Sequence, residues 1–308
     1  MKSKLMMMAA IAAVGMTLVS CSSDNESLVE DVKPGKAHVR LVCGMGVSVA
    51  PMSRAALTAN GNALTDIYIL DYDKVSGKLL QVLHQTSTAA DFAEPDLTLD
   101  YGEHVLKVVA TRSQEPTLWD AGKNTWMVEP NILTPITATQ PVMLTSTKTS
   151  DTFGAEKEVS VGIGTATTVS IALDRLVAKL VLNSTDVFPD DCTTITIDFQ
   201  EHRTISWTTM DVTEAVNNQR IVDVTNLRGT TGTVLIYFVL APKDGYQTDI
   251  TLTTNRADGN PYSTITVPDV PLERNKVTMI SGPIYGHGQG VQVTVNDAWD
   301  NEGHDINI

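Results

Sequence analysis

The residue types that most often bind metal ions or catalyse reactions are scattered through this sequence. None of the six histidines lies at ligand spacing from another histidine or from a cysteine. Two of them begin expected strands, and we expect both at the surface: His38 and His104. The remaining four are His84, His202, His287 and His304. The sequence therefore predicts no metal site built on histidine.

Two short runs near the C-terminus could in principle bind ions. Residues 296–303 (NDAWDNEG) are acidic, but they lack the alternating oxygen ligands and central glycine of an EF-hand loop. Residues 286–290 (GHGQG) lead into an expected strand rather than a helix, so no phosphate cradle is expected. Neither a G-x-S-x-G elbow nor an H-E-x-x-H motif occurs. We therefore expect no enzyme, no cofactor and no resident metal.

Cys21 is the cysteine with the clearest chemical context. Lys2 and Lys4 precede an apolar run, residues 5–19, which is shorter than the roughly 20 residues of a membrane-spanning helix. This arrangement is typical of a cleaved export signal. The residues before the cysteine, Leu18-Val19-Ser20, complete a sequence that resembles a lipobox. In a lipobox the cysteine sulfur takes a diacylglycerol, cleavage occurs before it, and the new amino group is acylated.

The lipobox resemblance predicts a signal peptide at residues 1–20 and a lipid-anchored mature chain. The polar, acidic residues 22–26 resemble the tract that directs such lipoproteins to the outer face of some outer membranes. Several acyl chains together anchor a protein stably. The alternatives are an ordinary secretory signal with a chance cysteine, or a retained membrane helix.

Composition limits the partners that this chain can have. Its 308 residues carry a formal net charge of −14, and the expected signal peptide contributes lysines but no acid. This charge argues against nucleic acid and against electrostatic binding to anionic lipid, so anchoring must come from the lipid itself. A hydrophobic content of 42% supports buried cores. Of the other two cysteines, Cys192 and Cys43, the latter sits on an alternating apolar face and is expected to be a core residue without a disulfide.

The elements that would carry any site are β-strands. Residues 21–36 are polar and serve as a tether, and residues 38–49 then alternate apolar and polar side chains. Further strand-like runs, separated by short turn signals, lie at residues 66–72, 78–85, 97–100, 104–111, 157–161, 167–173, 178–183, 193–199, 203–208, 219–224, 234–241, 249–254, 263–267, 277–284 and 291–295. This spacing predicts an all-β protein.

Two departures from the alternation define the domain organisation. Residues 113–149 lose it and contain Trp119 and Trp126, which predicts a partly helical insertion packed by its aromatic side chains. The strand pattern starts again after Asp174-Arg175, which predicts two tandem β-sandwich domains at residues 37–173 and 174–308. Residues 234–240 (VLIYFVL) are apolar on both faces and are expected to form a central strand.

Several stretches together resemble fimbrillin-type (type V) pilus proteins. In the first half these are residues 66–72 (DIYILDY), residues 150–154 (SDTFG) and residues 169–180 (VSIALDRLVAKL). Near the C-terminus, residues 271–275 (PLERN) and the closing run through Trp299 complete the pattern. The resemblance covers nearly the whole chain after the signal peptide, in the order that the family shows.

The resemblance implies two transthyretin-like (Greek-key) β-sandwich domains and export as a lipoprotein. The family includes polymerising stalk subunits, tip subunits and anchor subunits that hold the pilus to the outer membrane. In stalk subunits a protease cuts after an arginine beyond the first strand, which then leaves its place to a strand of a neighbour. In this sequence the corresponding cut would fall between Arg54 and Ala55. Alternatively, Arg54 is only a loop arginine and the first strand stays in place, as in an anchor subunit.

The sequence thus favours a structural or adhesive pilus component, held at the cell outer membrane through Cys21 and joined to other subunits by β-strand exchange. An anchor or accessory subunit is favoured over stalk and tip. The C-terminal residues 290–308 would be the donated strand or, alternatively, a resident edge strand with a polar tail. Partners would be other pilus subunits, the outer membrane and a host or bacterial surface ligand. The main alternative is a surface lipoprotein that binds glycan or host protein without polymerising.

Overall fold

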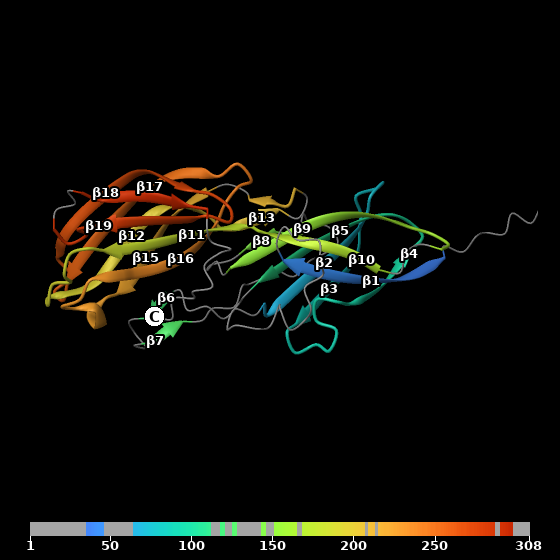
Figure 1. Cartoon of the computed structure of the whole chain (residues 1–308), viewed down its shortest axis with the longest axis horizontal. Helices are drawn as coiled ribbons and strands as arrows, with labels where there is room; N and C mark the ends of the chain where they lie inside the picture. The colour runs from blue at the N-terminus through green and yellow to red at the C-terminus, as the bar shows by residue number, and fades with distance from the viewer. Residues whose placement is uncertain are drawn as a thin grey trace, which may run out of the picture. The chain divides into compact units, whose positions relative to one another are not determined.

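A computed structural model of the chain describes residues 35–45, 64–111, 118–120, 125–127, 143–145, 151–164, 168–206, 209–212, 215–286 and 290–297. All of them belong to one compact unit, Gly35–Ile308. The described residues form β-strands and one short 3-10 helix, η1 (Thr225–Leu227). No helix among these residues is long and apolar enough to cross a membrane. The all-β prediction is confirmed (Figure 1).

The first β-sandwich joins two groups of strands at a corner. One group has the order β3-β2-β5-β9 and the other β10-β1-β4, and the corner is a two-residue pairing of β9 with β10. Alternating burial along each strand builds a shared core between the groups. The strands are β1 (Lys36–Met45), β2 (Asp66–Asp73), β3 (Leu79–Thr86), β4 (Asp96–Asp100), β5 (Gly102–Thr111), β9 (Thr152–Val161) and β10 (Thr168–Arg175).

The second β-sandwich repeats this plan. One group places β12 between β15 and β17, with β18 beyond β17, and the other has the order β16-β11-β19-β20. A single register pair, His202 with Leu240, links the two groups. The strands are β11 (Val177–Ser184), β12 (Cys192–His202), β15 (Ala215–Asp223), β16 (Gly232–Leu240), β17 (Tyr246–Arg256), β18 (Pro261–Leu272), β19 (Val277–Gly282) and β20 (Gln292–Asn296).

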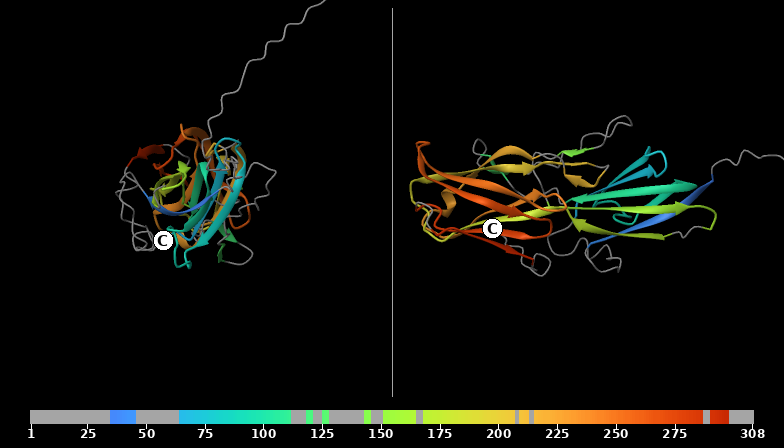
Figure 2. Two further views of the ribbon diagram at one scale, coloured as in Figure 1. Left: turned by 90° about the vertical axis from the view of Figure 1, so that its right-hand side faces the viewer. Right: turned by 90° about the horizontal axis from the view of Figure 1, so that it is seen from above.

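The two sandwiches share one unusual pairing. In each, the first strand runs parallel to a strand from the end of the same sandwich: β1 pairs with β10, and β11 pairs with β19. A parallel pair needs a long crossover connection, and here the rest of each sandwich supplies it. Figure 2 shows β1 in blue beside the green and yellow-green strands of its sandwich from two further directions.

Leu176 alone separates β10 from β11, so the first sandwich passes directly into the second. Beside it, the Arg175 Nε donates a hydrogen bond to Asp151 Oδ1 at 2.8 Å and its Nη1 donates to Asn275 Oδ1 at 2.7 Å. A third apolar cluster combines side chains of β2 and β5 with those of β11, β16 and β19. Arg175 and Leu176 therefore lie at a packed junction.

Short strands accompany the sandwiches. β6 (Leu118–Asp120) pairs with β7 (Thr125–Met127), and β8 (Met143–Thr145) pairs with β13 (Thr204–Ser206), which also pairs with β14 (Asp211–Val212). β6, β7 and β8 fall within the expected insertion, residues 113–149. The rest of that segment lies outside the described residues, so its expected helical part stays a prediction.

Residues 234–240 lie in β16, which stands in the middle of the strand order of the second sandwich, between β12 and β11. It pairs along its length with β11 and meets β12 at one register pair. The prediction of a central strand is therefore confirmed. Both of its faces are apolar because one packs in the second core, through Tyr237 and Val239, and the other packs in the junction cluster, through Phe238 and Leu240.

Candidate functional site

The first strand, β1, lies in a slot between two other strands. Its first half pairs antiparallel with β4, from Lys36 opposite Asp100 to Arg40 opposite Asp96. Its second half pairs parallel with β10, from Arg40 to Met45. The edge facing β4 is extended by two backbone hydrogen bonds, from Leu41 N–H to Pro95 O and from Cys43 N–H to Ala93 O, both 2.9 Å. The middle of β1 is therefore bonded on both sides.

The inward face of β1 supplies much of its binding energy. Val39 and Leu41 are fully buried, and Cys43 is 1% exposed, all within the first core. Each fully buried aliphatic side chain of this size contributes about 1.5–3 kcal/mol relative to an exposed one. The ion pairs of Lys36 with Asp100 and of Arg40 with Glu94 lie at the surface and add little. Removing β1 would therefore leave an apolar groove with unpaired backbone groups on both walls.

The reactivity of the Cys43 thiol depends on whether β1 occupies this slot. Burial, and secondarily the charge of Glu94, raises the pKa of its thiol to about 12. The thiol is free, as is that of Cys192 in the second core, so the expectation that Cys43 is a core residue without a disulfide is confirmed. A buried, protonated thiol is chemically inert. Cys43 becomes reactive only if β1 leaves its place.

The other strand relevant to exchange is β20, at the edge of the second sandwich. It pairs antiparallel with β19, from Val277 opposite Asn296 to Ser281 opposite Gln292. Val291 and Val293 pack against the second core, while Val295 is 41% exposed. In the described residues β20 is thus a resident edge strand, which was one of the two alternatives for the C-terminal segment.

The sequence-predicted site residues fall largely outside this description. Cys21, Arg54 and Ala55 lie outside the described residues, so lipidation and cleavage stay predictions. Trp119 and Trp126 are in register in the β6–β7 pair, and their side chains lie outside the description as well. Among the described residues, no group of three or more histidine, cysteine or carboxylate side chains could hold a metal ion.

His104 corrects the expectation that it lies at the surface. Its ring is 2% exposed, with Nδ1 at 2.7 Å from Asp71 Oδ1 and Nε2 at 2.8 Å from Asp100 O. Each ring nitrogen therefore has a hydrogen-bond partner inside the protein. Burial raises the pKa of Asp71, and the bond from His104 opposes that rise. His104, on β5, thus joins β2 to the last residue of β4.

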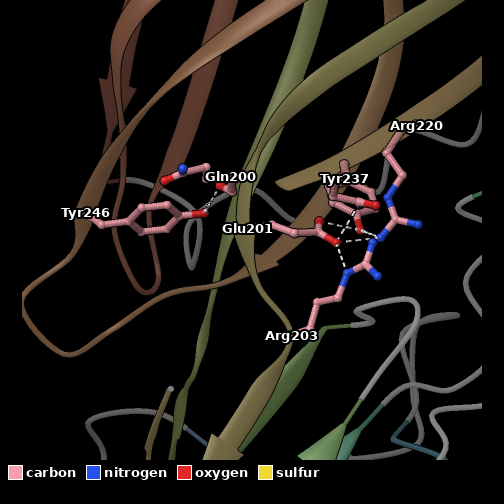
Figure 3. A network of polar contacts seen from close by, with 7 residues as sticks. Gln200, Glu201, Arg203, Arg220, Tyr237 and Tyr246 are labelled. Carbon is pink, nitrogen blue, oxygen red and sulfur yellow. Dashed lines mark hydrogen bonds and ion pairs between the residues drawn. The ribbon is translucent and has the colours of Figure 1, made fainter. Parts of the chain in front are cut away.

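The second sandwich contains a buried ionic network on β12, β15 and β16 that the strand pattern did not predict (Figure 3). Glu201 is 1% exposed, and its carboxylate accepts hydrogen bonds from Arg203, Arg220 and Tyr237 at 2.5, 2.8 and 3.0 Å. Asn218 Nδ2 donates a fourth at 2.7 Å. The Glu201 carboxylate is thus held by two cations and two neutral donors, so it links β12, β15 and β16 rather than offering a reactive group.

A signal for this network was present in the sequence. Glu201 lies on the inward-facing side of β12, in the same alternation as Ile195, Ile197 and Phe199. Arg220 lies on the inward-facing side of β15. Charges of opposite sign at inward positions of neighbouring strands indicate a buried pair. Burial, together with the charge of Glu201, raises the pKa of Tyr237 well above its usual value, so its hydroxyl stays protonated and donates.

Comparison with known proteins identifies relatives of the fold. A model of a family of unknown function, DUF6562, matches residues 127–308, and no curated protein sequence matches the chain. The structure of a candidate adhesin from Bacteroides thetaiotaomicron superposes with a TM-score of 0.54 at 12% identity, covering 86% of this chain and 97% of that one. A candidate polysaccharide-binding protein of the same species gives 0.52 at 11% identity, with coverages of 84% and 96%.

The fimbrial anchor protein Mfa2 from Porphyromonas gingivalis gives a TM-score of 0.48 at 10% identity, covering 85% of this chain and 98% of that one. At these identities, the two superpositions above 0.5 show that the chain shares the fold of those proteins.

Proposed function

We propose that this chain, which belongs to the family of unknown function DUF6562, is a structural or adhesive component of a cell-surface pilus that joins its neighbours by β-strand exchange. The observation that carries the proposal is the position of β1, which is bonded on both sides and buries one apolar face. A vacated slot of this kind would accept an extended strand through main-chain hydrogen bonds, with pockets fixing its register. The fold shared with a candidate adhesin is consistent with this role.

Within a pilus, we propose an anchor or accessory subunit held at the outer membrane by lipid on Cys21. Two observations favour this position over a stalk subunit. β1 occupies its slot by pairing with β4 over residues 36–40 and with β10 over residues 40–45, and β20 pairs with its own sandwich rather than extending as a free donor. We also propose residues 37–173 and 174–308 as the two domains, following the repeated strand plan.

The N-terminus of the protein recovered from the cell surface tests this proposal. A lipid-modified N-terminus at Cys21, with residues 38–45 still present, is expected for a retained anchor. A chain beginning at Ala55 would instead indicate a polymerising subunit from which β1 is released. An unmodified start elsewhere, with no association with other surface proteins after crosslinking, would contradict both versions.

A surface lipoprotein that binds glycan without polymerising is the second candidate function. It is favoured by a polar depression on the outer face of the second sandwich, which is described below. Crosslinking separates the candidates, because a non-polymerising protein forms no adducts with pilus subunits.

A further inference from the structure

Two strands of the second sandwich separate and leave a fork. The pairing of β12 with β17 runs from Cys192 to Asp198, and then stops, although both strands continue. Beyond that point, side chains replace the backbone ladder: Gln200 N–H donates to Thr248 Oγ1 at 3.1 Å, and Tyr246 Oη donates to Gln200 O at 3.1 Å. Figure 3 shows the Tyr246 hydroxyl directed at Gln200. The fork is therefore held open by specific hydrogen bonds.

A β-bulge lies in the same region. The register between β17 and β18 shifts between Thr248 and Ile250, opposite Asp269. Asp269 has φ +51°, and its N–H donates to Asp249 Oδ1 at 3.0 Å. Bulges bend a strand and redirect its side chains. An open depression of about 670 Å³ lies at the fork and the bulge. It is lined by Asp198, Phe199, Gln200, Asn217, Asn218, Gln219, Gln247, Thr248, Asp249 and Asp269.

The lining determines which ligands fit this depression. Five of its side chains are amides, which both donate and accept hydrogen bonds, and three are carboxylates, which only accept. Two carboxylates already have an internal donor: Asp198 binds Gln219 Nε2 at 2.8 Å, and Asp249 binds the N–H of Asp269. No lysine, arginine or histidine lines the described depression. Phosphate, sulfate and acidic sugars are therefore disfavoured by repulsion.

The geometry points to a carbohydrate site: we propose that this depression binds neutral sugar units of a polysaccharide through their hydroxyl groups. A sugar hydroxyl donates one hydrogen bond and accepts others, which matches a lining of mixed amides and carboxylates. The exposed amides of Asn217 and Gln247, on opposite sides of the fork, would each bind one hydroxyl pair. The volume lies in the range of small-molecule sites, about 300–1,000 Å³. Because the depression is open, a chain can continue beyond the bound unit.

This inference goes beyond the proposed pilus role and does not depend on strand exchange. The site uses only the second sandwich, whereas the exchangeable strand lies in the first. A failure of the sugar site would therefore leave the N-terminal analysis of the pilus proposal unaffected.

Affinity electrophoresis of the full chain tests the proposal, with yeast mannan, dextran, galactan and heparin as separate gel additives. We expect at least one neutral polysaccharide, but not heparin, to slow the wild-type chain. The double variant Asn217→Ala/Gln247→Ala should bind that polysaccharide at least about tenfold more weakly. Both side chains are exposed, so the variant should melt within about 2 °C of the wild type.

The control variant is Thr253→Ala, on β17 and outside the lining, where Thr253 contacts Thr264 at 3.4 Å. It should bind like the wild type. Retardation by no neutral polysaccharide, or equal binding by the double variant, would overturn the proposal. A third result would also overturn the proposal: poly-L-lysine resin captures both the wild type and the double variant, while neutral polysaccharides retard neither. That result would assign the carboxylates to a basic protein partner.

Discussion

Release of β1 can be measured through the two buried thiols of the chain. Cys43 lies on β1 in the first core, and Cys192 lies on β12 in the second. At pH 8 a thiol with a pKa of about 12 is ionised in about one molecule in 10⁴. Cys192 is fully buried, and burial raises the pKa of its thiol as well. A soluble alkylating reagent should therefore label neither residue while the fold is intact. Peptide mass spectrometry gives the extent of labelling at each cysteine separately.

The perturbation is Leu41→Ala, which truncates a fully buried side chain in the middle of β1. Leucine-to-alanine changes in cores cost about 2–5 kcal/mol. If the chain opens at β1 alone, a loss of about 3 kcal/mol raises the open population, and so the labelling rate of Cys43, by about 150-fold. The labelling rate of Cys192 should not change.

Leu252→Ala is the matched control, because Leu252 is 1% exposed in the second core. It should raise labelling of Cys192 and leave Cys43 protected. Equal labelling of both thiols in either variant would refute the reasoning, since it would mean that both cores open in one step and that β1 does not leave independently. Rapid labelling of Cys43 in the wild type would refute the placement of β1 in its slot.

Three further predictions concern stability. Glu201→Gln should lower the free energy of unfolding by about 3–5 kcal/mol in urea titrations, because the arginines around it lose their buried counter-charge; an unchanged midpoint would contradict that balance. The raised pKa of Asp71 means that the folded state holds the Asp71 proton more tightly than the unfolded state does. The free energy of unfolding should therefore fall as pH rises from about 3.8 towards the pKa of Asp71 in the folded state. Melting curves of Asp71→Asn should lack that fall, and the same pH dependence in variant and wild type would contradict this assignment. Gly154→Ala should cost about 1–3 kcal/mol in thermal melts, because its Cβ would lie 2.7 Å from Leu176 Cδ1; tolerance without loss would show that the junction yields.

Alternation of apolar side chains carried most of the fold prediction. The expected strands at residues 66–72 and 178–183 match β2 and β11 closely, because one buried face imposes a period of two. The pairing partners could not be predicted in this way. Periodicity describes the faces of a strand and says nothing about its edges, so the parallel pairing of β1 with β10 became visible only in the structure.

The polar features were less predictable for a different reason. His104 was expected at the surface because a histidine at a strand start usually is, and only its two acceptors, from separate parts of the chain, make its burial favourable. The fork between β12 and β17 is likewise a tertiary feature. Thr248 and Tyr246 are residue types that are common in strands. They hold the fork through hydrogen bonds to Gln200, which lies 46 residues from Tyr246 in the sequence.

The parallel pairing of the first strand has a mechanical consequence. β1 and β10 run in the same direction, and β10 continues through Leu176 into β11. Tension that enters at the N-terminal end of β1 and leaves through β11 would therefore slide the two strands along each other, which strains all the hydrogen bonds between them at once. Peeling, which breaks such bonds one at a time, would need the opposite orientation. A chain anchored at its start would resist pulling best in this arrangement.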